Sequence, residues 1–134
     1  MQYNIKITKT ENSKIGGLDF NNIPFGKIFS DHMFVADFID GKWQNAEIRP
    51  LEPIPTHPGN LAWHYGQAIF EGMKVSKSKA GNPILFRTKK HLERINESAR
   101  RMCMAEVPLE LFLEGLKELV KIDKAWIPPQ EGSA

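Results

Sequence analysis

Residues 63–74 read Trp-His-Tyr-Gly-Gln-Ala-Ile-Phe-Glu-Gly-Met-Lys and combine three aromatic rings, two glycines and two opposite charges. The stretch follows neither a helical nor a strand period over its whole length. Gly66 and Gly72 allow backbone angles or close approaches that a side chain would forbid. Tyr65 and Phe70 offer flat apolar surface. This combination suits the wall of a small-molecule pocket, whereas composition alone favours a buried strand-turn-strand whose aromatic side chains fill a core.

The composition is that of one ordinary globular domain. The chain has 134 residues, of which 41% are hydrophobic and 25% charged, and its net charge of +2 is too small to indicate binding to nucleic acid or to an anionic membrane. Cys103 is the only cysteine, which excludes an internal disulfide and favours a reducing compartment. No signal peptide or run of about 20 apolar residues is found. We expect a cytoplasmic location.

The first third of the chain has the pattern of strands. Apolar and polar residues alternate over residues 3–7, which predicts an edge strand with one wet face. Residues 32–39 and 42–48 are two β-rich runs, and the Asp40-Gly41 pair between them is a strong hairpin signal. These features predict an antiparallel sheet with one face to be covered.

Two residues near the sheet have both a structural and a functional interpretation. A polar loop over residues 9–22 leads to Phe25, which is either a core anchor beneath the loop or part of a cavity. His32 has no second metal ligand at a useful spacing, so we expect a structural histidine with satisfied hydrogen bonds.

The middle of the chain is predicted to be irregular. Residues 49–59 carry four prolines, which exclude a helix or a central strand and predict an extended surface connection. A short helix is expected over residues 61–67, ending near the glycines. Apolar residues near 73–75 and 84–86 predict two further strands, joined by a turn.

Two amphipathic helices are expected to cover the sheet. The first has Thr88 as its predicted N-cap, and its apolar stripe, which we expect to pack on the sheet, consists of Leu92, Ile95, Ala99 and Met102. Arg94 lies beside this stripe and points away from the core. The second helix begins at Val107-Pro108 and is expected to stop at Pro128-Pro129. The predicted class is α+β, an antiparallel sheet covered by two main helices.

The stretch at 63–74 resembles the His-Tyr-Gly-x-x-x-Phe-Glu-Gly signature of the branched-chain amino acid aminotransferases, which are pyridoxal-phosphate enzymes of fold type IV. Residues 24–33, 90–99 and 113–120 resemble the same family in the same order. Four ordered matches are more specific than one short motif. The resemblance implies that residues 1–127 are the N-terminal small domain of such an enzyme and that 128–134 begin an interdomain linker.

The resemblance also implies an activity and a set of site residues. The full-length enzyme would transfer the amino group of leucine, isoleucine or valine to 2-oxoglutarate through pyridoxal phosphate. Arg94, in its His-x-x-Arg context, is implied to bind the phosphate of that cofactor, a role that suits a planar guanidinium. The residues implied to bind the aliphatic substrate are Phe25, Tyr65, Phe70 and Gly72.

The lysine that carries the cofactor in the family lies in a second, larger domain, and no lysine here matches its context. We therefore assign no catalytic residue within residues 1–134 and expect the domain alone to be inactive. The implied partners are that second domain, a second copy in a homodimer, and the amino acid and 2-oxo acid substrates. Two alternatives remain open. One is a domain of another fold type IV enzyme, a D-amino acid aminotransferase or an aminodeoxychorismate lyase; the other is a non-catalytic interaction domain.

Overall fold

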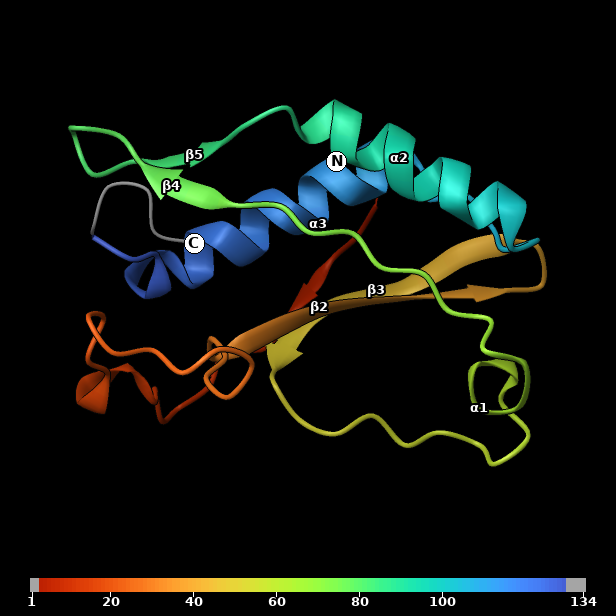
Figure 1. Cartoon of the computed structure of the whole chain (residues 1–134), viewed down its shortest axis with the longest axis horizontal. Helices are drawn as coiled ribbons and strands as arrows, with labels where there is room; N and C mark the ends of the chain where they lie inside the picture. Colours follow the sequence, from red (N-terminus) through yellow and green to blue (C-terminus); the bar gives the residue numbers. More distant parts are fainter. Residues whose placement is uncertain (1–2, 130–134) are drawn as a thin grey trace.

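The chain is built on a three-stranded sheet, seen in a computed structural model that describes residues 3–129 (Figure 1). The strands β1 (Lys6–Ile7), β2 (His32–Ile39) and β3 (Lys42–Pro50) lie in the order β1-β3-β2. β2 and β3 are antiparallel, but β1 runs parallel to β3. The sheet is therefore mixed rather than purely antiparallel. The chain between β1 and β3 includes all of β2, which runs back across the sheet and so allows β3 to run parallel to β1.

The hairpin of β2 and β3 is confirmed at the predicted turn. Asp40 and Gly41 have φ angles of 51° and 76°, the two positive values that a tight type I′ turn needs. β3 is the central strand and continues to Pro50, so the prediction that 49–59 contains no part of a central strand is wrong. β1 pairs only with Glu47 and Ile48, so the end of β3 faces β2 alone and a residue without an N–H is tolerated there.

One helix covers the sheet. α3 (Leu109–Ile122) packs against both β2 and β3, and its Leu111 is fully buried together with Ile48. α2 (Thr88–Arg101) packs on α3 instead, so the expectation that its apolar stripe packs on the sheet is wrong. Because β1 is only two residues long, the sheet is narrow, and a single helix occupies its face.

The ends of both helices differ from the sequence prediction. Arg87, with a φ of 54°, precedes α2 as its N-cap, so Thr88 is the first helical residue rather than the cap. Pro108 precedes α3 in the same way and is extended, with a ψ of 144°. α3 ends at Ile122, before the prolines that were expected to stop it, and a 3₁₀ turn, Lys124–Trp126, follows.

A buried histidine and two buried carboxylates join the ends of the chain. The backbone N–H of Thr10 donates to His32 Nε2 over 2.9 Å, so the proton of the neutral ring lies on Nδ1, which donates to Asp123 Oδ1 over 2.6 Å. The His32 N–H donates to the other Asp123 oxygen. The prediction of a structural histidine with satisfied hydrogen bonds is confirmed. No metal-binding cluster is found within residues 3–129.

Asp31, next in the chain, is the second buried carboxylate. Burial pushes the pKa of Asp31 upwards, but hydrogen bonds from the Lys14 N–H, the Ser13 hydroxyl and the Trp126 indole outweigh this, and the pKa is lowered. The carboxylate therefore fastens the loop before β2 to the turn after α3. Both carboxylates act as structural acceptors here.

The remaining elements are short and lie at separate places around the main sheet and its helices (Figure 1). β4 (Val75–Lys77) and β5 (Pro83–Leu85) make a two-stranded antiparallel sheet, and α1 (Leu61–Tyr65) and a 3₁₀ turn, Ile15–Gly17, complete the structure. Figure 1 shows α2 and α3 on one side of the main sheet and the β3–α1 connection on the other. The α+β class is confirmed. None of the described helices has the length and apolarity needed to cross a membrane.

We predict that Gly115→Ala lowers the free energy of unfolding, because a methyl group on the buried Gly115 would lie 2.4 Å from the Phe34 ring. Overpacking of this kind costs about 1–3 kcal/mol, which exceeds the gain of about 1 kcal/mol in helix propensity. Denaturant unfolding measures the difference. Lys117→Ala, on the exposed side of α3, is the control and should be near neutral.

A second substitution identifies the cause. Phe34→Leu removes the ring, so Gly115→Ala should cost less in that background than in the native chain. An equal cost in both backgrounds, or a higher unfolding free energy for Gly115→Ala, would contradict the close approach.

Candidate functional site

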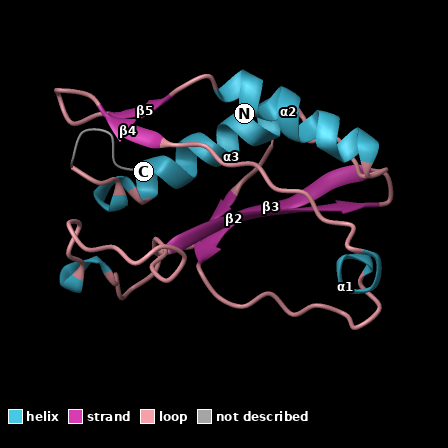
Figure 2. Ribbon diagram, viewed as in Figure 1, coloured by secondary structure: helices cyan, strands magenta, loops and turns pink. Residues whose placement is uncertain are grey.

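The segment between α1 and β4 starts from a short helix with well-defined caps. α1 begins with Asn60, whose side-chain oxygen accepts from the Ala62 N–H over 2.8 Å, and ends at Gly66 in the left-handed conformation, with a φ of 64°. The short helix predicted to end near the glycines is thus confirmed. From Gly66 the chain runs to β4 as a loop without regular secondary structure (Figure 2). Glu71 and Gly72 lie in this irregular part.

Glu71 is the best-connected polar side chain of the segment. Its carboxylate is 8% exposed and accepts from Arg94 Nε over 2.5 Å and from Arg94 Nη2. The Gly72 N–H donates to it over 2.9 Å, and His91 Nδ1 lies 3.2 Å from the same oxygen. Because an ionised carboxylate only accepts, the His91 proton is on Nδ1. Two residues of α2 thus meet one residue of a distant segment.

The charges in this cluster stabilise each other. The hydrogen bonds from Arg94 lower the pKa of Glu71 to about 2, in spite of the burial of the carboxylate, and the bond from His91 adds to the effect. The hydrogen bonds to Glu71 raise the pKa of Arg94. Glu71 is therefore ionised over the whole physiological pH range, and the Glu71–Arg94 pair carries no net charge.

Arg94 can still contact an anion. Its side chain is 67% exposed, as predicted for a residue beside the apolar stripe of α2. Nε and Nη2 face Glu71, and Nη1 has no protein hydrogen-bond partner among residues 3–129. An arginine bound on one edge keeps donors on the other edge. The donor set fits one side of a phosphate group, although the neutral pair requires further positive charge or N–H donors from elsewhere.

The predicted aromatic residues are exposed. Phe25, Tyr65 and Phe70 all have more than four-fifths of their surface accessible, at 103%, 82% and 93%. The interpretation of these residues as core aromatics is therefore wrong. In Figure 1 the loop that carries Phe25 lies at the opposite end of the main sheet from α1. The only close ring pair among residues 3–129 is Phe38–Trp43. The role of these residues in substrate binding stays a prediction.

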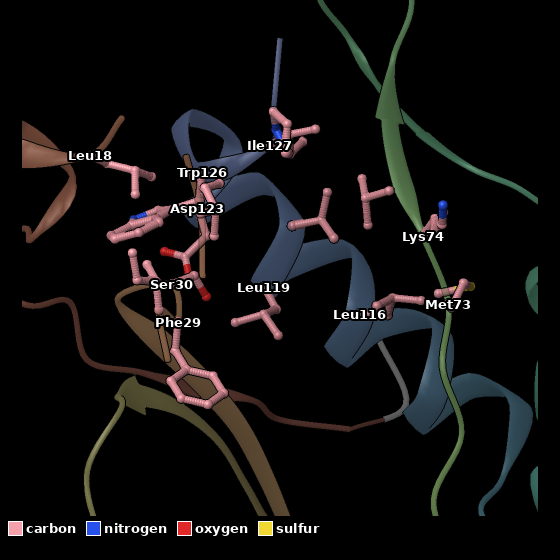
Figure 3. Close-up of a pocket in the computed structure, with 15 residues that line it drawn as sticks. Leu18, Phe29, Ser30, Met73, Lys74, Leu116, Leu119, Asp123, Trp126 and Ile127 are labelled. Atoms are coloured by element: carbon pink, nitrogen blue, oxygen red, sulfur yellow. The ribbon is translucent and has the colours of Figure 1, made fainter. Parts of the chain in front are cut away.

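An apolar hollow of about 390 Å³ lies elsewhere, between α3, the 18–30 loop and the chain entering β4 (Figure 3). Its walls include Leu18, Phe29, Met73, Leu116, Leu119 and Trp126. None of the five predicted site residues lines it. Of the predicted site residues, the fold brings Gly72 and Arg94 together, because each donates hydrogen bonds to Glu71.

Sequence reasoning missed the pairing of Glu71 with Arg94. It singled out both residues, but it placed Glu71 in a motif and Arg94 on a helix without relating them. One signal was present, because residues 50–73 contain no lysine or arginine. A carboxylate that becomes buried in this stretch must find its cation in another segment, and α2 is rich in cations.

Comparison with known proteins gives a consistent set of relatives. The chain is 42% identical over 131 residues to branched-chain-amino-acid aminotransferase 2 of Bacillus subtilis (strain 168), which covers 97% of this chain and 35% of the relative. It is 38% identical over 117 residues to branched-chain-amino-acid transaminase 1 of the same strain, covering 87% and 33%. A branched-chain-amino-acid aminotransferase of Mycolicibacterium smegmatis is 40% identical over 112 residues, covering 83% and 30%.

The chain spans about a third of the length of these curated relatives. No protein-family model matches it.

The low pKa of Glu71 predicts a pH-dependent contribution to stability. A carboxyl whose pKa is lowered on folding stabilises the fold above its unfolded pKa, and the contribution is lost as the pH falls through the folded value. The native chain should therefore exceed Glu71→Gln in unfolding free energy by the largest margin above pH 4.5, and the margin should shrink towards pH 2.

Denaturant midpoints at several pH values measure this margin. Glu97→Gln is the control, because Glu97 and Arg101 form an exposed pair within α2. Its unfolding free energy should differ from that of the native chain by a small, nearly constant amount. A margin for Glu71→Gln that does not change between pH 5 and pH 2 would contradict the ion pair.

Proposed function

Since this chain belongs to the branched-chain-amino-acid aminotransferase family, we propose that residues 1–127 form the N-terminal small domain of such an enzyme and that 128–134 begin the linker to a second domain. The observation that carries the proposal is the 42% identity over 97% of the chain. The complete enzyme would move the amino group of leucine, isoleucine or valine to 2-oxoglutarate. It would work in the cytoplasm as a homodimer of fold type IV.

The proposed cofactor is pyridoxal phosphate, which when bound supplies the electron sink for transfer of an amino group. In this chain Arg94 would hold its phosphate. Support comes from the exposed guanidinium, which has donors left on the edge away from Glu71. Charge-assisted hydrogen bonds from such an edge give both strength and direction. Because Glu71 cancels the charge of Arg94, the rest of the phosphate site must come from the second domain.

The substrate wall would consist of Phe25, Tyr65 and Phe70, with Gly72 leaving room beside them. All three rings are exposed in this chain, which leaves their apolar surface available for burial by a substrate or another domain. Apolar burial yields about 25 cal/mol per Å² and distinguishes poorly between side chains that differ by one methylene. A wall of this kind would accept all three branched amino acids.

The exposed apolar surface also supports contacts with the second domain and the second subunit. Large exposed apolar patches on a soluble protein indicate an interaction surface. Besides the aromatic wall, the exposed apolar side chains include Phe29, Ile54, Leu61, Trp63 and Phe86.

The reactive lysine is proposed to lie in the second domain. No lysine within residues 3–129 is buried, and Lys77 is the only one that is half-buried. Burial is what lowers the pKa of a lysine far enough for use as a nucleophile. The lysines of this chain have no such environment.

We predict that the chain of residues 1–134 alone forms no specific covalent adduct with pyridoxal phosphate, because none of the lysines among the described residues is buried. After mixing, borohydride reduction and gel filtration, mass spectrometry should show no stoichiometric modification at any single lysine. One uniquely modified lysine that also gives the yellow absorbance of the bound cofactor would refute the assignment.

The phosphate role predicts that Arg94→Ala weakens pyridoxal phosphate retention in the full-length enzyme. We expect a loss of roughly tenfold or more, since charge-assisted hydrogen bonds to the phosphate are removed. Arg101→Ala is the matched control, because Arg101 also lies on α2 and also pairs with a glutamate. Equal retention in the two variants would refute the role of Arg94.

A further inference from the structure

We propose that Glu71 is the positioning residue of Arg94: it holds one edge of the guanidinium, so that the opposite edge faces the anionic group of the ligand. This inference rests on the proposed phosphate role of Arg94. Glu71 itself would not touch the ligand. Its task is to fix the direction of another side chain.

The contrast in burial identifies which partner is fixed. The Glu71 side chain is 8% exposed, whereas that of Arg94 is 67% exposed. Both oxygens of Glu71 are engaged, since Oε2 accepts from Arg94 Nε, and Oε1 accepts from Arg94 Nη2, from the Gly72 N–H and from His91. The carboxylate is therefore held from three residues. The long Arg94 side chain is held in place by its two hydrogen bonds to this carboxylate.

A second arginine–glutamate pair, which lies within α2, provides a comparison with the Glu71–Arg94 pair. Arg101 and Glu97 make a single contact of 3.1 Å, with side chains 78% and 59% exposed, and both belong to α2. Exposed pairs at this spacing contribute little to stability, because holding two long side chains in one geometry costs conformational entropy. The Glu71–Arg94 pair is bidentate, and its two residues come from different segments. Of these two pairs, the Glu71–Arg94 pair fixes the orientation of a planar guanidinium.

His91 supplies the second hold on the carboxylate. Its side chain is 22% exposed and reaches Glu71 from the helical turn before Arg94. Donation from Nδ1 keeps Oε1 in place when Arg94 also contacts a ligand. Pre-ordering of this type lowers the conformational entropy that a ligand must overcome on binding.

The proposal can be separated from a simple counter-charge role, because the two predict opposite signs. If Glu71 only neutralises Arg94, Glu71→Gln adds net positive charge and strengthens binding of a phosphate group. If Glu71 orients Arg94, Glu71→Gln weakens binding in spite of that added charge, because a carboxamide can accept on one atom only. Glu71→Asp keeps the charge but shortens the reach, so only the orienting role predicts a loss for both variants.

The experiment measures the dissociation constant of pyridoxal phosphate for the full-length enzyme and its variants. We expect a loss of roughly tenfold or more for Glu71→Gln and a smaller loss for Glu71→Asp, the scale on which outer partners of ligand-holding side chains act. Glu97→Gln, the matched control, should bind as the native enzyme does. Unchanged or tighter binding by Glu71→Gln would overturn the proposal.

A second measurement does not depend on the cofactor. In the chain of residues 1–134, the Nε–H of Arg94 should exchange slowly with water and give a resolved NMR signal, and this signal should broaden in both Glu71 variants. A merely structural role would change the melting temperature but leave this signal in place in Glu71→Asp. A native Arg94 Nε–H that exchanges as fast as that of Arg101 would overturn the proposal even if Glu71→Gln fails to fold.

Arg94→Ala distinguishes this proposal from the one on which it rests. If Arg94→Ala leaves cofactor binding unchanged, the phosphate role itself fails. If Arg94→Ala weakens binding and the Glu71 variants do not, only the positioning role of Glu71 fails.

Discussion

The hydrogen bonds between His32 and Asp123 are the constraint on which the rest of the fold depends. They join the first residue of β2 to the C-cap of α3, 91 positions later in the chain. The neighbouring Asp31 carries the same connection to the loop before β2 and to Trp126. A buried polar group without a hydrogen-bond partner raises the free energy of the fold. These contacts therefore give one arrangement of the sheet and α3 a much lower free energy than its alternatives.

The candidate site depends on that arrangement indirectly, through the packing of α2 on α3. α3 lies on the sheet, α2 packs on α3, and the outer side of α2 presents His91 and Arg94. The segment that carries Glu71 reaches α2 from α1. The site is thus a junction between an element of the packed core and an irregular segment. His91 and Arg94, the basic side chains that contact Glu71, belong to the packed element.

Features set by neighbouring residues were predictable from the sequence. Asp40-Gly41 specifies its turn through the backbone angles that those two residues accept, and Gly66 ends α1 for the same reason. Features set by distant partners were not. The parallel pairing of β1, the end of α3 at Ile122 and the packing of α2 on α3 all depend on contacts that no local pattern encodes.

The same distinction holds for the site residues. The exposed position of Arg94 followed from helical spacing, but its pairing with Glu71 depends on how two segments meet. The exposure of Phe25, Tyr65 and Phe70 could not be foreseen either, because aromatic residues are more often buried than exposed. The family resemblance implies a role for these residues but does not say how exposed they are in this chain.

The prolines and the lack of cations in the β3–α1 connection have a practical consequence for limited digestion. Every residue from 51 to 66 is exposed, which is the usual condition for attack by a protease. Trypsin nevertheless finds no cleavage site between Arg49 and Lys74, whereas a protease specific for aromatic residues finds Trp63, Tyr65 and Phe70 within easy reach. Cleavage at Trp63, Tyr65 or Phe70 would therefore cut the chain between the β2–β3 hairpin and α2 and leave those elements whole.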